Sequence, residues 1–290
     1  MPHKVTNQQV SPPMILVFDS GVGGLSVCQS ILALCSDVRI VYIADNAAFP
    51  YGTKSDEYLR ARIVKVLSEQ CAARQPDVLV IACNTASTLV LPDLRERLSI
   101  PVVGVVPAIK PAASGTQTGV IGLLATPATI QRTYTNQLIS DFAPHCKMVR
   151  VGSSRLVEIA EEYLRGEPVN GVELTEITSS FFDESHNASI DKIVLGCTHF
   201  PLLRDQLEES SPKSVEWMDS GNAIAQRVKA LLENVAWKQA SSSRNQPVKI
   251  IHHIIFTGDC PTNEFFESML YSLGFKYVKL AGNISPDHKL

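Results

Sequence analysis

Short apolar segments alternate with longer amphipathic segments along almost the whole chain, and this alternation restricts the possible folds more than any other feature. The apolar segments are mostly rich in Val and Ile and cover residues 14–18, 40–44, 78–82, 102–106, 120–124, 148–151, 193–195 and 250–256. Segments of this length and composition are typical of strands buried in a parallel sheet.

Helical patterns lie between these apolar segments, at residues 55–74, 87–98, 129–142, 156–166, 202–209 and 221–234. Strands that alternate with helices predict an α/β fold with right-handed crossovers. A chain of 290 residues is also long enough for two domains, at roughly 150 residues each.

A weak internal repeat supports two related lobes. Residues 80–85 (VIACNT) resemble residues 194–199 (VLGCTH), and residues 16–20 (LVFDS) resemble residues 123–126 (LLAT). We therefore expect one lobe from residues 1–106 with 213–290, carrying Asp19 and Cys83. The other lobe would be residues 107–212, carrying Thr126, Cys197 and His199. Ligands bind at the carboxyl ends of strands in open α/β sheets, so the repeated motifs would line one shared cleft.

Composition excludes several classes of protein. The formal net charge is −3 and no basic stripe is present, which argues against a nucleic-acid partner. The chain has no run of ~18 apolar residues for a membrane span, and its first 13 residues lack the apolar core of a secretion signal. Seven cysteines without a C-x-x-C pair favour a reducing compartment, so we expect a cytoplasmic protein.

Two of the cysteines are placed for chemistry. Cys83 and Cys197 each follow an apolar strand, precede polar residues and stand at the start of a predicted helix. The positive end of a helix dipole lowers the pKa of a thiol, which favours the reactive thiolate. The other interpretation is packing, the usual role of a free cysteine. We assign that role to the remaining five: Cys28, Cys35, Cys71, Cys146 and Cys260.

Two thiols across a cleft are compatible with three chemistries. A disulfide redox pair usually occupies a C-x-x-C motif, which is absent here. A metal site using Cys197, His199 or the His252-His253 pair would lack the standard ligand spacings. The third chemistry is proton transfer at a stereocentre, in which one thiolate removes a proton and the opposed thiol returns one from behind.

Seven motifs, in order, resemble those of glutamate racemases: FDSGVGGLS at 18–26, FPYG at 49–52, ACNTAS at 82–87, GLLAT at 122–126, LGCTHFPL at 195–202, MDSG at 218–221 and FTGD at 256–259. Residues 151–158 (VGSSRLVE) look most like the proteobacterial branch. The resemblance covers nearly the whole chain. It implies two Rossmann-like lobes and a cofactor-independent isomerase that interconverts L- and D-glutamate for peptidoglycan synthesis, and hence for cell-wall biogenesis and cell shape.

The resemblance also implies roles for individual residues. Cys83 would take the proton from D-glutamate and Cys197 from L-glutamate, with Asp19 beside the first thiol and His199 beside the second. Glu158 matches a third acidic residue of the family, although it also fits a solvated helix face. The residues expected to bind substrate are Asp19, Ser20, Pro50, Tyr51, Gly52, Cys83, Asn84, Thr85, Thr126, Thr129, Cys197, Thr198 and His199. No metal ligand is expected.

Two other functions are compatible with the sequence. An aspartate racemase would also resemble a two-thiol, two-lobe enzyme. A two-lobed amino-acid sensor without catalysis is the alternative outside the enzymes, but simple binding needs no opposed bases. The resemblance further suggests activation by UDP-N-acetylmuramoyl-L-alanine, because some proteobacterial members carry an N-terminal extension like residues 1–13. The sequence is compatible with a monomer or a homodimer.

Overall fold

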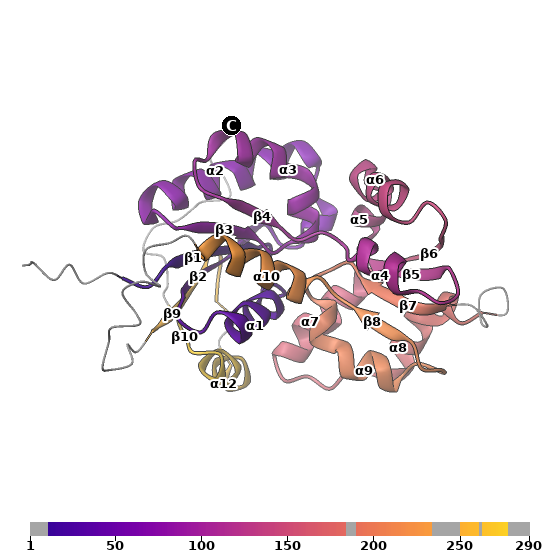
Figure 1. Ribbon diagram of the computed structural model, residues 1–290. Helices are drawn as coiled ribbons and strands as arrows, with labels where there is room; N and C mark the ends of the chain where they lie inside the picture. The colour runs from indigo at the N-terminus through magenta and orange to yellow at the C-terminus, as the bar shows by residue number, and fades with distance from the viewer. Residues whose placement is uncertain (1–10, 184–189, 234–249, 261–262, 278–290) are drawn as a thin grey trace, which may run out of the picture.

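Two parallel sheets form the framework of the molecule, and they lie beside one another in Figure 1. The computed structural model describes residues 11–183, 190–233, 250–260 and 263–277. Every strand pairing within these residues is parallel. The α/β fold with two parallel sheets is therefore confirmed.

The first sheet has six strands in the order β10-β9-β2-β1-β3-β4. Their bounds are β1 Met14–Asp19, β2 Arg39–Ala44, β3 Val78–Ile81, β4 Val102–Gly104, β9 His252–Phe256 and β10 Phe275–Tyr277. One face is covered by α2 (Asp56–Arg74) and α3 (Asn84–Arg97), and the other by α1 (Leu25–Leu34), α10 (Gly221–Leu232) and α12 (Glu264–Ser272) (Figure 1). We call this sheet with its helices the first lobe.

Strand β1 lies in the middle of that sheet, between β2 and β3. Its side chains alternate in direction, so Ile15 and Val17 join the core beneath α1 and α10, whereas Leu16 and Phe18 join the core beneath α2 and α3. Each of these side chains is fully buried, which is worth ~1.5–3 kcal/mol per side chain. Asp19 at the carboxyl end of β1 is therefore held by two cores and two neighbouring strands.

The second sheet has the order β6-β5-β7-β8. Its strands are β5 Val120–Ala125, β6 Lys147–Gly152, β7 Ile190–Leu195 and β8 Glu216–Met218. One face packs against α7 (Arg155–Leu164), α8 (Gly171–Thr178), the 3-10 helix η4 (Phe200–Leu203) and α9 (Arg204–Glu209), and the other against α4 (Ile109–Gly115) and α6 (Thr133–Phe142). This sheet with its helices is the second lobe.

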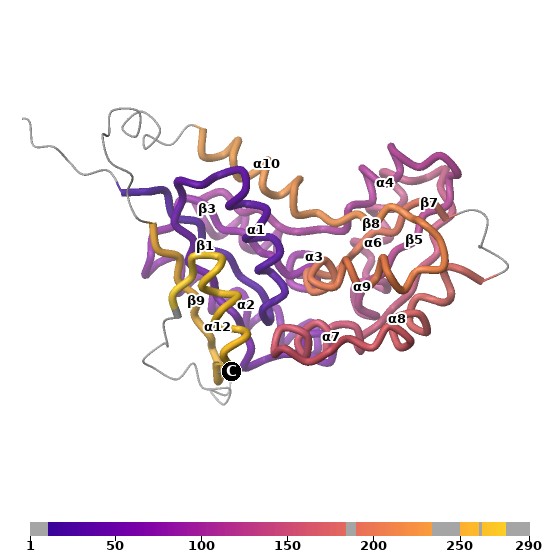
Figure 2. The backbone as a smooth tube through the Cα atoms, turned by 90° about the horizontal axis from the view of Figure 1, so that it is seen from below, coloured from indigo at the N-terminus to yellow at the C-terminus, as the bar shows by residue number. Residues whose placement is uncertain are grey.

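The chain passes between the lobes twice, from β4 to α4 and from β8 to α10, and Figure 2 shows these two connections running side by side. The Ser220 hydroxyl donates a hydrogen bond to the Val106 carbonyl and joins them. Strand β8 pairs with β7 in the second sheet, whereas residues 213–290 had been assigned to the first lobe. A strand of only three residues carries too little pattern to reveal its sheet. The lobe division otherwise remains a prediction.

Some elements differ from their predicted bounds. The expected helix at 129–142 is divided into two helices, α5 (Pro127–Gln131) and α6. The break occurs because the backbone of Arg132 is extended and the Thr135 hydroxyl donates a hydrogen bond to the Thr129 carbonyl. Helix α3 begins at Asn84 rather than residue 87, which makes Cys83 its N-cap residue. Three further 3-10 helices lie in the loops: η1 Asn46–Ala48, η2 Tyr51–Thr53 and η3 Ser179–Phe181.

Candidate active site

A cavity of about 650 Å³, partly open to solvent, lies where strand ends of both lobes meet. Its lining residues come from both lobes: Ser20, Phe49, Pro50, Tyr51, Gly52, Thr53, Cys83, Asn84, Thr85, Thr126, Thr129, Ser154, Val157, Glu158, Gly196, Cys197, Thr198 and His199. Of the residues expected to bind substrate, all but Asp19 line this cavity. Phe49, Thr53, Ser154, Val157 and Gly196 were not predicted from the sequence.

Cys83 brings a thiol to the cavity from the first lobe. It follows β3 and caps α3, and its Sγ lies 3.6 Å from the Ser20 hydroxyl oxygen. The residue is only 6% exposed. Ser20 in turn donates from its backbone N–H to Asp19 Oδ1 over 2.6 Å. The thiol is thus surrounded by polar groups although it is almost excluded from solvent.

Cys197 brings the second thiol from the other lobe. It follows β7, and its Sγ lies 3.8 Å from His199 Nδ1. The other ring nitrogen of His199, Nε2, lies 2.8 Å from Glu161 Oε1 on α7. Both Cys197 and His199 are buried. Glu161, His199 and Cys197 therefore form a series of polar contacts that ends at the cavity. Such an arrangement orients an imidazole beside a nucleophile or base.

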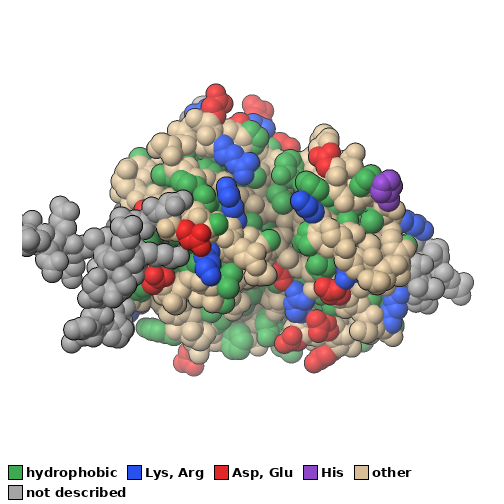
Figure 3. Space-filling model, viewed as in Figure 1, with side chains coloured by type: hydrophobic (Ala, Val, Ile, Leu, Met, Phe, Trp, Pro, Cys, Tyr) green, Lys and Arg blue, Asp and Glu red, His purple; other side chains and the backbone are tan. Residues whose placement is uncertain are grey.

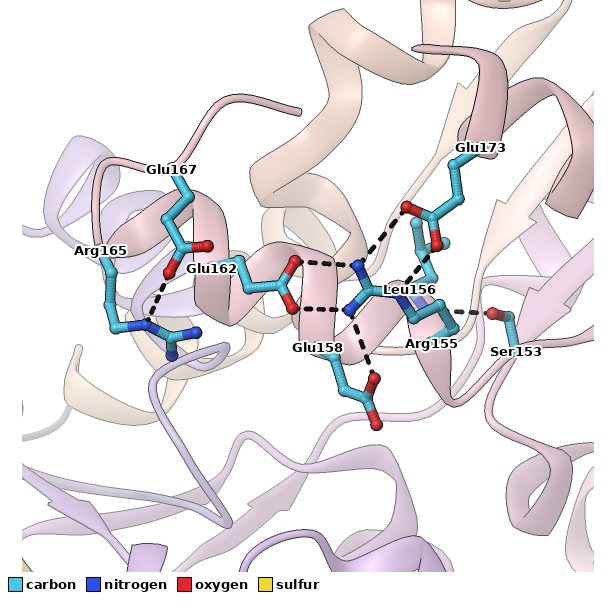
Figure 4. A network of polar contacts seen from close by, with 8 residues as sticks. All are labelled: Ser153, Arg155, Leu156, Glu158, Glu162, Arg165, Glu167 and Glu173. Atoms are coloured by element: carbon cyan, nitrogen blue, oxygen red, sulfur yellow. Dashed lines mark hydrogen bonds and ion pairs between the residues drawn. The ribbon is translucent and has the colours of Figure 1, made fainter. Parts of the chain in front are cut away.

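Glu161 is the residue that the sequence interpretation missed. It was Glu158 that matched the family's acidic residue, but Glu158 points to Arg155 at 3.3 Å and its side chain is 58% exposed. Figure 4 shows Arg155 between the carboxylates of Glu158, Glu162 and Glu173. Glu158 lies at the edge of the cavity, in contact with this ion-pair network, and not with His199.

The helical period could have indicated Glu161. It follows the buried Val157 by four residues, so it lies on the edge of the apolar face of α7, whereas Glu158 and Glu162 lie toward the opposite face.

The glycine-rich segment after β1 packs directly on this imidazole. A Cβ on Gly23 would lie 2.5 Å from His199 Nδ1, and one on Gly21 would lie 2.8 Å from Glu161 Oε1. The Val22 backbone N–H also donates to Glu161 Oε1 over 3.4 Å. Close approach of the first lobe to His199 and Glu161 therefore requires residues without side chains at these positions.

Asp19 lies behind the cavity wall. It is fully buried, and its two oxygens accept from Ser20 and from the Thr198 hydroxyl, the latter over 3.0 Å from Oδ2. Its contact with Cys83 passes through Ser20. Asp19 thus connects Ser20, beside the first thiol, to Thr198, the residue after the second thiol. A direct contact between Asp19 and substrate remains a prediction.

Hydroxyl and amide groups line the cavity between the thiols. Thr126 caps α5 and donates to Thr129, whose hydroxyl lies 3.5 Å from that of Thr85 across the two lobes. The Asn84 Oδ1 atom is buried and has no hydrogen-bond partner among the residues that the structure describes. An unsatisfied buried polar atom costs free energy, so a donor supplied by a ligand would be stabilising here.

Burial decides the charge state of the first thiol. Its effect, with that of Asp19, raises the pKa of Cys83 well above the usual range, although the Ala86 backbone and the Ser20 hydroxyl oppose the change. The Ala86 backbone N–H at the start of α3 lowers this pKa, in the direction expected, but desolvation of the buried thiolate outweighs it.

The pKa of the His199 imidazole is also raised, for a different reason. Burial is the largest single effect and lowers its pKa, but hydrogen bonds and charge interactions with Cys197 and Glu161 together outweigh burial. The pKa of His199 is therefore raised well above its usual value. An imidazolium beside Cys197 would stabilise the thiolate form of that residue.

Other features concern the remainder of the chain. His252 on β9 is buried. Among the described residues no group of three or more His, Cys, Asp or Glu is arranged to hold a metal ion. No helix in the described ranges is long and apolar enough to span a bilayer. Acidic and basic side chains are interspersed over the face in Figure 3.

The fold and the two-thiol cavity are those of amino-acid racemases. Residues 15–228 match the Asp/Glu/hydantoin racemase family, and the chain belongs to this family. Within it, the chain groups with the proteobacterial glutamate racemases. It is 50% identical over 235 residues to the glutamate racemase of Pectobacterium atrosepticum, covering 81% of this chain and 82% of that protein.

Solved structures agree. Escherichia coli glutamate racemase, determined in complex with L-glutamate and the activator UDP-MurNAc-Ala, has a TM-score of 0.83 and 41% identity, covering 92% of this chain and 97% of that one. The Bacillus anthracis isoform RacE1 has a TM-score of 0.76 and 28% identity, covering 94% and 98%.

Proposed function

We propose that this protein interconverts L- and D-glutamate by two-base proton transfer, with Cys83 and Cys197 as the bases, and so supplies D-glutamate for peptidoglycan synthesis. One observation carries the mechanism: two buried thiols, one from each lobe, line the same cavity at equivalent positions after a strand. The glutamate racemases to which the chain is similar support the substrate.

The reaction requires each thiol in a different protonation state. With L-glutamate, the Cys197 thiolate takes the α-proton, and the C–H electron pair stays on the α-carbon. The Cys83 thiol then donates its proton to the opposite face, which leaves Cys83 as thiolate and Cys197 as thiol. D-Glutamate reacts in reverse from that second state. The raised pKa of Cys83 and the imidazole beside Cys197 favour the state that accepts L-glutamate.

The carbanion is the energetic difficulty, because an α-proton is far less acidic than a thiol and each unit of pKa mismatch costs ~1.4 kcal/mol. Donors directed at the substrate α-carboxylate can stabilise the developing charge in a cavity with little water. The Thr85 hydroxyl and the backbone N–H groups at the start of α3 are suitably placed, whereas the hydroxyls of Thr126 and Thr198 already donate to Thr129 and Asp19. In this proposal Asp19 and Ser20 orient Cys83, and His199 orients Cys197.

Racemisation in heavy water tests the mechanism. Two-base transfer puts deuterium in the product enantiomer while the remaining substrate stays protonated at early times. A single base would exchange both. Loss of optical rotation, or circular dichroism, follows the rate, and Cys83→Ser and Cys197→Ser should each lower it by more than ~100-fold. Full turnover by both variants would disprove the two-thiol mechanism.

Substrate class is tested in the same assay. If aspartate is racemised more slowly than glutamate, the aspartate racemase alternative is excluded. Tight binding of glutamate without any deuterium incorporation would instead favour the amino-acid sensor.

Three further properties belong to the proposal. The Escherichia coli relative was solved with UDP-MurNAc-Ala as an activator, so we propose that the same nucleotide activates this protein. An assay with and without it, on the full chain and on a variant lacking residues 1–13, tests both activation and the extension.

A cytoplasmic location fits a protein that uses reduced thiols. The oligomeric state, monomer or homodimer, can be measured by light scattering.

A further inference from the structure

A second buried carboxylate, away from the thiols, has every acceptor position occupied. Asp45 follows β2 and is fully buried. Its Oδ2 accepts from the Tyr51 hydroxyl at 2.6 Å and from Arg62 Nε at 2.7 Å. Its Oδ1 accepts from Arg62 Nη2 at 2.6 Å and from the Thr257 hydroxyl at 2.7 Å. The ionised carboxylate is compensated by a bidentate guanidinium and two hydroxyls, which is the geometry that makes a buried charge tolerable.

These contacts join Asp45 to three segments, two of them nearby in the chain and one that is 212 residues away. Arg62 lies on α2, Thr257 follows β9, and Tyr51 belongs to η2 in the cavity wall. The Asp45 backbone N–H also donates to the Asp19 carbonyl at 2.8 Å, at the end of the central strand. The carboxylate therefore stands between the rigid strand ends and the wall formed by Pro50, Tyr51 and Gly52.

The wall itself has few other polar attachments. Among hydrogen bonds between described residues, those of residues 50–53 are local, such as Lys54 N–H to the Tyr51 carbonyl and the Thr53 hydroxyl to the Pro50 carbonyl. The Tyr51–Asp45 bond is the one that leaves the segment. The wall's position relative to the thiols thus depends on Asp45 and on packing of the Tyr51 ring, which is 3% exposed.

We propose that Asp45 is a positioning residue for the substrate, which acts through Tyr51 by holding the Pro50–Tyr51–Gly52 wall at a fixed distance from the two thiols. The inference rests on the proposed racemisation. The wall lines the cavity but offers no base, so loosening it should weaken substrate binding more than it slows proton transfer.

Thr257 offers a test because its hydroxyl donates to Asp45 and accepts from the Ala47 N–H, while the residue does not line the cavity. Thr257→Val removes the hydroxyl and preserves the shape, whereas Thr257→Ser keeps the hydroxyl. Asp45 itself is a poorer choice, because its removal would leave Arg62 buried without a counter-ion and destabilise the fold. We expect Thr257→Val to raise the KM for glutamate roughly 3- to 10-fold with kcat nearly unchanged, and Thr257→Ser to restore it.

A structural effect alone would look different. Partial unfolding lowers the active fraction, so kcat falls while KM stays constant. Thr175→Val is the matched control, because the Thr175 hydroxyl bonds only carbonyls of Gly171 and Ser210, remote from the cavity. An unchanged KM in Thr257→Val, or a rise of equal size in Thr175→Val, would overturn the proposal.

Hydrogen exchange of the backbone separates this proposal from the proposed function. Amides of residues 51–54 should exchange faster in Thr257→Val than in wild type or Thr257→Ser, whether or not glutamate is the substrate. If the wild type fails to racemise glutamate but this difference is present, the proposed function fails and the attachment of the wall stands. If exchange is the same in all three proteins, Asp45 does not hold the wall.

Discussion

The carboxylate of Glu161 lies 2.8 Å from Nε2 of His199, on the side of the ring away from the Cys197 thiol. An imidazole with one nitrogen bound to a carboxylate has its tautomer and orientation set for the other nitrogen. The raised pKa of His199 comes partly from this contact. Glu161 is thus placed to control the second thiol without touching the cavity.

Replacing Glu161 by Gln should change the pH dependence of the reaction. The carboxylate helps to raise the pKa of His199, so its loss lowers that pKa and the imidazolium disappears at lower pH. The alkaline limb of kcat/KM against pH should move to lower pH, with a loss of ~10-fold or more at pH 8. Since the equilibrium constant of a racemisation is one, kcat/KM must fall equally in both directions.

Glu158→Gln is the matched control for that experiment. Its side chain is exposed and bonded to Arg155, so its pH profile should overlay that of the wild type. A shifted profile in Glu158→Gln with none in Glu161→Gln would reverse the assignment.

Gly23→Ala should damage activity by steric displacement of His199. The new Cβ would lie 2.5 Å from Nδ1 and 2.7 Å from Cγ of the ring, which forces the imidazole away from Cys197. A misplacement near 1 Å costs about 100-fold in rate. Gly171→Ala provides the comparison, because nothing lies within 4 Å of its Cβ position. Racemisation rates of the two variants at equal folded fraction, measured by circular dichroism, decide the point, and equal rates would refute it.

Acid should destabilise the first lobe through His252. Its Nδ1 accepts from the Ile40 N–H at 3.2 Å, and burial lowers its pKa in the folded protein. In the unfolded chain the pKa of His252 is about 6.5, so at acidic pH this side chain binds more protons there than in the folded protein. The contribution of neutral His252 to stability is therefore fully present above pH ~6.5 and is lost as the pH falls toward the pKa of the folded state. Each unit of depression contributes ~1.4 kcal/mol.

Urea unfolding at pH 8 and pH 5.5 measures this loss. His252→Asn keeps an acceptor near the Nδ1 position without titrating, so it should lose less stability than wild type between the two pH values. His253, whose pKa is also lowered by burial, makes a smaller contribution to the same dependence of the unfolding free energy on pH. His145→Asn, at an exposed position, should behave as wild type. An undiminished slope in His252→Asn would show that other groups dominate.

The ion pair between Arg132 and Asp56 should make substrate affinity depend on salt. It joins the second lobe to the start of α2 by two bonds of 2.8 and 2.7 Å, and Asp56 is 64% exposed. Asp56→Asn should raise the KM by no more than ~5-fold, because exposed pairs contribute 0 to ~1 kcal/mol. The difference should vanish in about 1 M salt, where the Debye length is ~3 Å.

Asp93→Asn, which breaks the Arg60–Asp93 pair within the first lobe, is the control and should leave the KM unchanged at either salt concentration. A KM difference for Asp56→Asn that persists at high salt would contradict an electrostatic contribution of the Arg132–Asp56 pair to substrate affinity.

The local sequence was sufficient for the elements that carry the two thiols. Buried strands at 78–82 and 193–195 are visible as apolar runs, and polar residues after them mark the cavity edge of a parallel sheet. Cys83, Cys197 and His199 could therefore be assigned together, and the structure brings all three to one cavity. The three-residue strand β8 and the break at Arg132 were not predicted, because short elements depend on contacts beyond their own pattern.

The amino-acid sequence by itself determined the two sheets and the strand ends at which the reactive residues stand, because hydrophobic periodicity is a local property that every strand and helix carries along its own length. Only the tertiary structure decided that Glu161 rather than Glu158 reaches His199, that Asp45 joins α2, the residue after β9 and the cavity wall, and that burial outweighs the helix terminus and raises the pKa of Cys83. These depend on which groups from distant segments meet, and on how much water they exclude when they do.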